Sequence, residues 1–131
     1  MSNRLKDKAD NVFSLYIRQR DGMCALAGQG GIACSGRLEC CHWEERGFMA
    51  LRYDEENAFA GCLAHHRDWW HSMNPQKSRD AKATARRLWP ERWEHIQEVL
   101  EKYRGKNKIN PMFVPDYENV IKLYQSKLQK L

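Results

Sequence analysis

The sequence has no long hydrophobic run, and its apolar stretches extend over only a few residues. A transmembrane helix needs about 20 predominantly apolar residues, so this pattern excludes a membrane-spanning protein. The first residues, MSNRLKDKADNV, also contain no apolar segment of the kind found in a secretory signal peptide. We therefore expect a cytoplasmic protein, in a reducing compartment where disulfides are disfavoured.

Internal repeats and low-complexity segments are missing as well, and the chain has only 131 residues. This length suits one compact domain and excludes most multidomain enzymes. The formal net charge is +5, with 30% charged residues. Such a modest positive charge agrees with a nucleic-acid partner but does not require one.

Cysteine and histidine are abundant for so short a chain, with five of each. All the cysteines and four of the histidines lie between Cys24 and His71. The pattern predicts a single domain, 1–131, with three parts: an N-terminal helix at 1–22, a Cys/His module at 23–73 and a helical extension at 74–131. In a reducing compartment, clustered cysteine and histidine favour a metal site over disulfides.

The first predicted element is a helix that buries one face. Val12, Phe13, Tyr16 and Ile17 recur at helical spacing, with Asp7 or Asp10 available as a cap. Residues 22–36 contain five glycines, which is too many for a regular element. We expect this segment to be a loop that wraps around another part of the protein.

The module then predicts a β-hairpin followed by a helix. Candidate strands are 38–43 and 49–53, separated by the polar turn EERG, and a helix begins near Cys62. In the extension, Ser78 is a candidate helix cap, and Pro90 and Pro115 suit the starts of two further helices. Residues 105–115 are predicted to form a loop.

Ligand spacing predicts a structural zinc site. Cys62 and His65 are separated by two residues, so both can reach one ion, and Cys24 and Cys34 at the two ends of the glycine-rich loop supply the partner pair. Cys40 is a reserve ligand. For Cys40 and Cys41, however, burial as small hydrophobic residues is favoured over metal binding.

A fixed register of asparagine, cysteine and histidine follows, with Cys62, His65 and His66 at five, eight and nine residues after Asn57. Together with RQRDGMC, CCHWEERG and LRYDEENAFAGC, this register resembles the HNH (ββα-metal) endonucleases, and is most similar to the nuclease part of the phage NinG (Rap) recombination proteins. The resemblance covers residues 10–131 and is strong over 18–71.

The resemblance implies catalytic roles for His42, Asn57 and His66. His42 matches the first histidine of the motif and would be the general base, because a neutral imidazole suits that task near pH 7. Asn57 would hold the loop that orients His42, and His66 would bind a catalytic Mg²⁺ or Mn²⁺ ion. Two positions depart from the NinG pattern: His65 replaces a zinc cysteine, and His66 replaces an asparagine.

Further residues are candidates for completing the site. Glu44, Glu45 and Asp54 are candidate oxygen ligands, although exposure to solvent is the favoured outcome for each. His71 follows His66 by five residues, which matches one helical face poorly, so a metal or phosphate role is the less favoured interpretation. His95 is expected to be a surface histidine.

Basic and aromatic residues around the module predict a nucleic-acid interface. We expect one of Trp69 and Trp70 to be buried and the other to be free. The proposed DNA-binding residues are Arg18, Arg20, Arg46, Arg67 and Trp70.

The sequence thus predicts an α+β protein, mostly α by residue count. Its core would be a small zinc-stabilised ββα-metal (HNH, treble-clef-like) unit with an N-terminal helix and C-terminal helices. The predicted function is a metal-dependent DNA endonuclease, implied by the resemblance to act in phage or prophage recombination on branched or structured DNA in a bacterial host cell.

Two alternatives stay open. One is a non-catalytic zinc module that binds nucleic acid or a recombination protein. The other is a redox protein that uses Cys40 and Cys41. The sequence also leaves open the catalytic metal, the preferred DNA and a homodimer formed through Leu123 and Leu128 of the last helix.

Overall fold

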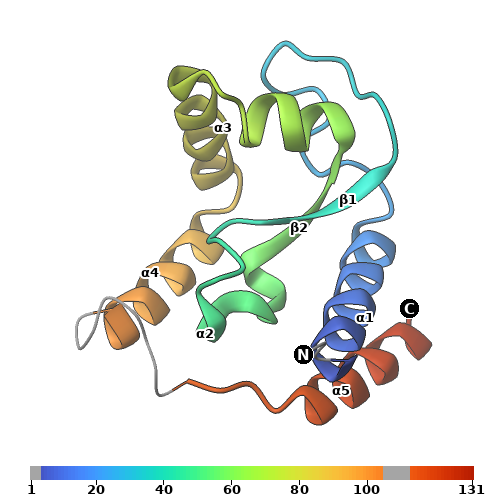
Figure 1. Ribbon diagram of the computed structural model, residues 1–131. Helices are drawn as coiled ribbons and strands as arrows, with labels where there is room; N and C mark the ends of the chain where they lie inside the picture. The colour runs from blue at the N-terminus through green and yellow to red at the C-terminus, as the bar shows by residue number, and fades with distance from the viewer. Residues whose placement is uncertain (1–3, 105–112) are drawn as a thin grey trace.

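The computed structural model describes residues 4–104 and 113–131, which form a mainly helical α+β fold around a two-stranded sheet (Figure 1). Most of the predicted loop at 105–115 lies outside these residues. The elements are α1 (Arg4–Asp21), β1 (Leu38–His42), α2 (Met49–Arg52), η1 (Glu55–Asn57), β2 (Ala58–Cys62), η2 (Ala64–Trp70), α3 (Pro75–Leu88), α4 (Pro90–Arg104) and α5 (Tyr117–Gln129). This architecture confirms the predicted α+β class and its helical majority.

The sheet is an antiparallel pair in which Leu38 lies opposite Cys62 and His42 lies opposite Ala58. The first strand was predicted correctly, but the prediction of a strand at 49–53 is wrong. That segment contains the short helix α2, which buries Leu51. The second strand is β2 instead, and all five of its residues are buried.

Helix α1 covers one face of the sheet and packs along α5 (Figure 1). The predicted apolar face is confirmed, because Phe13, Tyr16 and Ile17 are buried there together with Tyr124 of α5. Helix α5 therefore folds back on the core. Asp10 lies in the middle of α1 and does not cap it, since the helix begins at Arg4.

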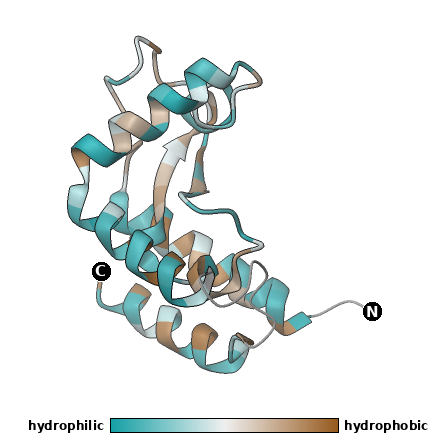
Figure 2. Cartoon of the chain, turned by 90° about the vertical axis from the view of Figure 1, so that its left-hand side faces the viewer, coloured by the Kyte–Doolittle hydropathy of each residue, from teal (hydrophilic) through white to brown (hydrophobic). Residues whose placement is uncertain are grey.

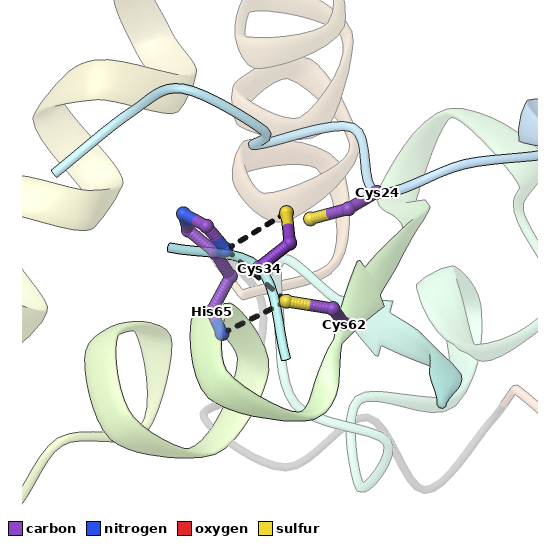
Figure 3. A group of neighbouring side chains, drawn as sticks. All are labelled: Cys24, Cys34, Cys62 and His65. Atoms are coloured by element: carbon purple, nitrogen blue, oxygen red, sulfur yellow. Dashed lines mark hydrogen bonds between the residues drawn. The ribbon is translucent and has the colours of Figure 1, made fainter. Parts of the chain in front are cut away.

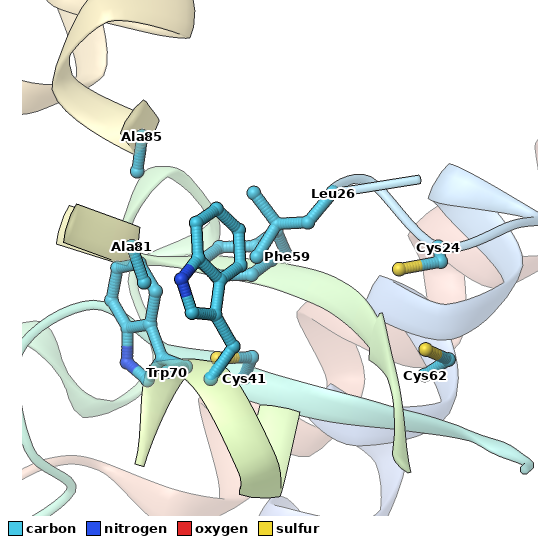
Figure 4. Close-up of a cluster of buried hydrophobic side chains, with 9 residues drawn as sticks. Cys24, Leu26, Cys41, Phe59, Cys62, Trp70, Ala81 and Ala85 are labelled. Atoms are coloured by element: carbon cyan, nitrogen blue, oxygen red, sulfur yellow. The ribbon is translucent and has the colours of Figure 1, made fainter. Parts of the chain in front are cut away.

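The other face of the sheet packs against η2 and α3 through a cluster that includes Cys41, Phe59, Trp70, Ala81 and Ala85 (Figure 4). The Phe59 and Trp70 rings meet edge to face, with centroids 5.0 Å apart. Alanines on α3 let the helix approach these large rings closely. Figure 2 shows hydrophobic and hydrophilic residues mixed along the helices, as expected for elements buried on one side.

The first two helices of the extension begin at residues suited to a helix start. Helix α3 is capped by the Asn74 side chain, which accepts from the Gln76 backbone N–H at 2.9 Å. The predicted cap, Ser78, lies inside α3 and donates to the Trp70 carbonyl at 2.9 Å. Helix α4 begins at Pro90 as predicted, because proline lacks only a donor that the first helical turn does not use.

Among residues 4–104 and 113–131, no helix combines the length and hydrophobicity that a membrane crossing requires.

Candidate metal centre and histidine pocket

Four side chains from three chain segments converge beside the start of η2 (Figure 3). Cys24 and Cys34 come from the glycine-rich loop, Cys62 ends β2, and His65 lies in the first turn of η2. Their ligand atoms all lie within 4.8 Å of one another. The structure therefore brings together the four residues that the sequence predicts as metal ligands.

The His65 ring is oriented for metal binding. Its Nδ1 lies 3.1 Å from Cys62 Sγ and 3.7 Å from Cys34 Sγ. Its Nε2 lies 3.0 Å from the Gln29 carbonyl oxygen, which can only accept a hydrogen bond. Nε2 therefore carries the proton, and the lone pair on Nδ1 points at the sulfur atoms. Metal-bound histidines characteristically have such a carbonyl partner on the second nitrogen.

Local hydrogen bonds also favour the thiolate form of Cys62. Burial by itself would raise the pKa of this thiol, but hydrogen bonds from the backbone of His65 and Ser35 act in the opposite direction and lower the pKa. The His65 amide lies 3.4 Å from Cys62 Sγ. Because thiolates are the metal-binding form of cysteine, the local structure prepares this residue to be a ligand.

Three sulfur atoms and one imidazole nitrogen form a donor set typical of structural zinc sites. Three of the four residues are buried, and Cys34 is exposed. The residues present therefore fit a structural metal ion such as zinc, which would connect the glycine-rich loop to β2 and η2.

Two glycines allow the loop to approach the module closely. Gly30 has φ +71°, and a Cβ atom there would lie 2.7 Å from the Trp69 ring. Gly36 has φ +83°, and its Cβ would lie 2.5 Å from the Leu63 side chain. The prediction that this loop wraps another part of the protein is confirmed: it lies on Trp69 and on the metal-ligand cluster.

The remaining cysteines lie on β1. Cys41 is fully buried in the cluster with Phe59, whereas Cys40 packs beside the α1–α5 cluster on the other face. Burial raises the pKa of Cys40 to about 12 and that of Cys41 well above its ordinary value. Buried thiols of this kind are unreactive, which supports a packing role and argues against the redox alternative.

His42 ends β1 and is held by a backbone contact. Its Nε2 lies 2.9 Å from the Arg52 carbonyl oxygen, so Nε2 carries the proton and Nδ1 keeps its lone pair. The ring also lies against Phe13, with centroids 5.6 Å apart. Burial lowers the pKa of His42 to about 4, so the imidazole is neutral near pH 7.

Asn57 holds the segment between the two strands. This fully buried side chain accepts from the Glu44 N–H at 2.8 Å and donates to the carbonyl oxygens of Glu44 and Leu51 at 3.2 and 3.0 Å. The contacts span residues 44–51, immediately after His42. Asn57 therefore holds the loop that follows His42.

A second network fixes the residue whose carbonyl contacts His42. Arg52 is buried, and its guanidinium donates two hydrogen bonds to Asp10, at 2.9 and 2.7 Å. The Tyr53 hydroxyl donates to the same carboxylate at 2.8 Å. Burial would raise the pKa of Asp10, but these donors outweigh it and lower the pKa. This role of Asp10 was not predictable from the sequence, because the network depends on contacts distant in sequence.

A pocket of about 450 Å³ lies at the end of β1 and beside η2. Its lining includes His42, Glu45, Arg46, His66, Arg67 and His71. Two histidines predicted to act together, one from β1 and one from η2, thus border the same cavity. A neighbouring pocket of about 410 Å³ shares His42 and Arg46 and extends along α1.

His66 is oriented by a carboxylate on β1. Its Nδ1 lies 3.0 Å from Glu39 Oε1, and Glu39 also accepts two hydrogen bonds from Arg67, at 3.1 and 2.8 Å. Burial raises the pKa of Glu39, but the donors from Arg67 and His66 outweigh it and lower the pKa. Glu39 was not among the predicted site residues, although its position three residues before His42 is visible in the sequence.

His71 is a second residue that the sequence analysis did not favour. Its ring centroid lies 4.9 Å from that of His66, and both rings line the pocket. The side chain is exposed overall, but partial removal from solvent, together with the nearby His66 and Lys82, lowers the pKa of His71. Regular α-helical spacing would turn His71 away from His66, whereas η2 is a π-helix.

The predicted DNA-binding arginines divide into two groups. Arg46 and Arg67 are exposed at the pocket, and Arg18 lines the neighbouring pocket. Arg20 has a structural role instead, because it pairs with Asp21 and donates to the carbonyl oxygens of Glu55 and Ala58 at 2.7 and 2.8 Å.

The aromatic part of the predicted interface is wrong. Trp69 and Trp70 are 3% and 1% exposed, so neither is free to stack on a base. Trp70 packs against Phe59 and Trp43. Adjacent residues on η2 are both buried because the glycine-rich loop covers one ring and α3 covers the other.

The three candidate carboxylate residues lie in different surroundings. Glu45 lines the pocket, whereas Asp54 pairs with His95 at 2.6 Å on the α4 side of the molecule. Glu44 contacts Asn57 through its backbone. His95 is a partly exposed histidine in an ion pair with Asp54 and Glu56, and the Asp54 carboxylate raises its pKa.

Comparison with known proteins identifies no relative: no family model matches the chain, and neither the curated proteins nor the solved structures contain a significant match.

Proposed function

We propose that the protein is a zinc-stabilised, metal-dependent DNA endonuclease of the HNH type. The observation that carries the proposal is the shared pocket: His42 and His66, two histidines from different elements, border one cavity of about 450 Å³. A resident zinc ion on Cys24, Cys34, Cys62 and His65 is part of the same proposal.

His42 is the proposed general base. Hydrolysis of a phosphodiester requires a water molecule to lose a proton as it attacks phosphorus. The lone pair on His42 Nδ1 accepts this proton, and the ring keeps its orientation through the Nε2 contact with Arg52. Asn57 and the Asp10–Arg52 network support this orientation from the loop and from α1.

His66 is the proposed ligand for the catalytic ion. The contact between Nδ1 and Glu39 leaves Nε2 as the nitrogen available for coordination. A divalent ion held there would supply Lewis-acid chemistry, neutralising charge on the phosphate and stabilising the leaving 3′ oxygen. The bond between phosphorus and that oxygen breaks as the bond to water forms.

Exposed arginines at the pocket rim provide charge for a phosphate backbone. Arg46 and Arg67 each have more than half of their side chain exposed, at 56% and 58%. Arg46 pairs with Asp10, which holds the Arg52 residue that contacts His42, and Arg67 pairs with Glu39, which contacts His66 itself. A backbone phosphate bound by these arginines would therefore lie directly beside the proposed site.

The proposal is tested by assaying duplex, single-stranded, flap and four-way-junction DNA with magnesium, manganese and nickel. We expect the wild type to cleave DNA and His42→Ala to reduce the rate by about 10² to 10⁴. His95→Ala is the matched control, because it removes a histidine outside the pocket. DNA binding and zinc content are measured for all three proteins.

Retained DNA binding and zinc content in an inactive His42→Ala variant would support the nuclease. A wild type that binds DNA but never nicks it with any of these ions would overturn the proposal. That result would instead favour the non-catalytic zinc module that binds nucleic acid.

A further inference from the structure

The π-helical form of η2 determines which residues lie above one another. In this segment the His71 backbone N–H donates to the His66 carbonyl oxygen at 3.0 Å, a bond that spans five residues. The bond closes one wide helical turn between His66 and His71, the residue that caps η2. In an α-helix, with 3.6 residues per turn, positions five apart would point about 140° away from each other.

The side chains follow this register. The His66 and His71 ring centroids are 4.9 Å apart, with the ring planes inclined by 54°. His71 is exposed, so core packing does not account for its position. Local π-helical turns occur frequently at functional sites.

The His66 ring is set to present one nitrogen to the pocket that His71 also borders. Glu39 occupies Nδ1 of His66 at 3.0 Å, and Arg67 holds Glu39 in place through two hydrogen bonds. A carboxylate behind a histidine raises the basicity of the ring and orients it for a metal ion. Glu45 lines the same pocket.

We propose that His66 and His71 bind one divalent transition-metal ion together, and that the π-helical turn exists to bring them onto the same ion. The inference deepens the proposed nuclease by naming a second ligand and a class of ion. It relies on the proposed function for the role of the ion in cleavage, whereas the binding of the ion stands on the two rings and the pocket alone.

The donor set determines the class of ion. Imidazole nitrogen suits nickel, cobalt, zinc and copper, and affinity for such sites rises along the first-row series. Magnesium prefers oxygen ligands and gives up its water molecules reluctantly. Two adjacent imidazoles therefore favour a transition-metal ion over Mg²⁺, and a lone His66 would favour it less.

The test uses the zinc-loaded full chain, purified without a histidine tag and titrated with Ni²⁺ by calorimetry. We expect the wild type to bind one further ion while its zinc content stays unchanged. His66→Ala and His71→Ala should each weaken this binding by about tenfold or more. All titrations are carried out in the His95→Ala background, because the ligand atoms of Asp54, Glu56 and His95 also lie within 4.8 Å of one another and could hold nickel. Millimolar Mg²⁺ should not displace the nickel.

Folding is checked separately through zinc content and melting temperature, which His71→Ala should leave unchanged because the residue is exposed. Wild-type affinity in His71→Ala would overturn the inference. So would two nickel ions in the wild type, one lost with each variant, because the histidines would then act independently.

The cleavage assay separates this inference from the nuclease itself. Nickel binding that requires both histidines in a protein that never cuts DNA would leave the metal site standing and remove the nuclease. Cleavage at the wild-type rate by His71→Ala, together with wild-type nickel affinity, would leave the nuclease standing and remove His71 from the metal site.

Discussion

His42 differs from a surface histidine in its proton affinity. Burial lowers the pKa of this imidazole to about 4, and the contact between Nε2 and the Arg52 carbonyl only partly offsets the shift. A general base acts in its unprotonated form, which predominates above its pKa. His42 is therefore in the active form throughout the range in which an ordinary histidine, with a pKa of about 6.5, titrates.

We expect the cleavage rate at saturating divalent ion to show no loss centred near pH 6.5 as the pH falls from 8 to 5.5. The measurement is a pH profile of single-turnover cleavage, with zinc content checked at each pH. A loss centred near pH 6.5 that disappears in His42→Ala would show that His42 titrates as a solvent-exposed residue.

Asp10 should matter for stability despite lying on the first helix. Asp10→Asn would leave the buried Arg52 guanidinium without its counter-charge, at a cost of about 3 kcal/mol in the free energy of unfolding. Asp7→Asn on the same helix is the control, because Asp7 is exposed. Urea unfolding at pH 7 measures both, and equal stabilities would contradict the network.

The pH dependence of the Asp10 contribution follows from its lowered pKa. Stability from this carboxylate is complete above the unfolded-state pKa, about 3.9, and is lost as the pH falls through the lower folded-state value. The difference between wild type and Asp10→Asn should therefore stay constant from pH 8 to 5. A difference that shrinks within that range would contradict this assignment.

Among the elements, the glycine-rich loop offers a matched series of substitutions. Gly28 and Gly30 both have positive φ, of 80° and 71°, but only a Cβ at Gly30 would meet the Trp69 ring. Gly28→Ala should show the backbone cost alone, about 1 kcal/mol. Gly30→Ala should cost a further ~1–3 kcal/mol from the clash.

Gly47→Ala completes the series, because Gly47 has no neighbour within 4 Å and no positive φ. We expect it to change the free energy of unfolding by less than about 0.5 kcal/mol. Thermal or urea unfolding of the zinc-loaded variants measures all three. Equal effects of Gly28→Ala and Gly30→Ala would show that the loop does not press on Trp69.

The elements also show what could be predicted from the sequence. The buried face of α1 was predictable because its apolar residues recur at helical spacing. The strand that ends at His42 was predictable because it lies between the glycine-rich loop and a polar turn. The second strand was not, since AFAGC is buried on both sides and shows no alternation. A short apolar run of this kind fits a buried strand or a helix equally well.

The site residues also divide into those with a local signal in the sequence and those that depend on the folded structure. The four metal ligands were predictable because cysteine and histidine cluster in one segment and because two residues separate Cys62 from His65, a spacing typical of metal ligands. The closeness of His66 and His71 was not, because it depends on a five-residue hydrogen bond where sequence patterns assume 3.6 residues per turn. Burial of both tryptophans likewise depends on the distant loop and α3.

For the whole molecule, the described core is divided into three small clusters rather than one. One lies between the sheet and α3, one between the sheet and α1 with α5, and one between α2 and α4. Small separate cores give limited stability, so a metal ion that joins the loop, β2 and η2 should contribute strongly. We therefore expect zinc to be required for the folded state.

The prediction is tested by removing a ligand or the ion. Cys34→Ser should abolish tight zinc binding and lower the melting temperature by at least about 10 °C, as should a strong chelator. Cys40→Ser is the control for zinc content, since Cys40 lies outside the metal-ligand cluster. A Cys34→Ser variant with full zinc content and unchanged melting temperature would contradict the assignment.

The contact between α1 and α5 has a consequence for the order of folding. Phe13 and Tyr124 meet edge to face at 4.9 Å although 111 positions separate them in sequence (124 − 13), and Ala58 of β2 packs in the same cluster. Contacts that close so long a segment carry a high entropic cost before they contribute stability. During synthesis, the α1 side of the sheet therefore stays incompletely covered until α5 has left the ribosome. Docking of this last helix is the step at which we expect the nascent chain to become resistant to proteolysis.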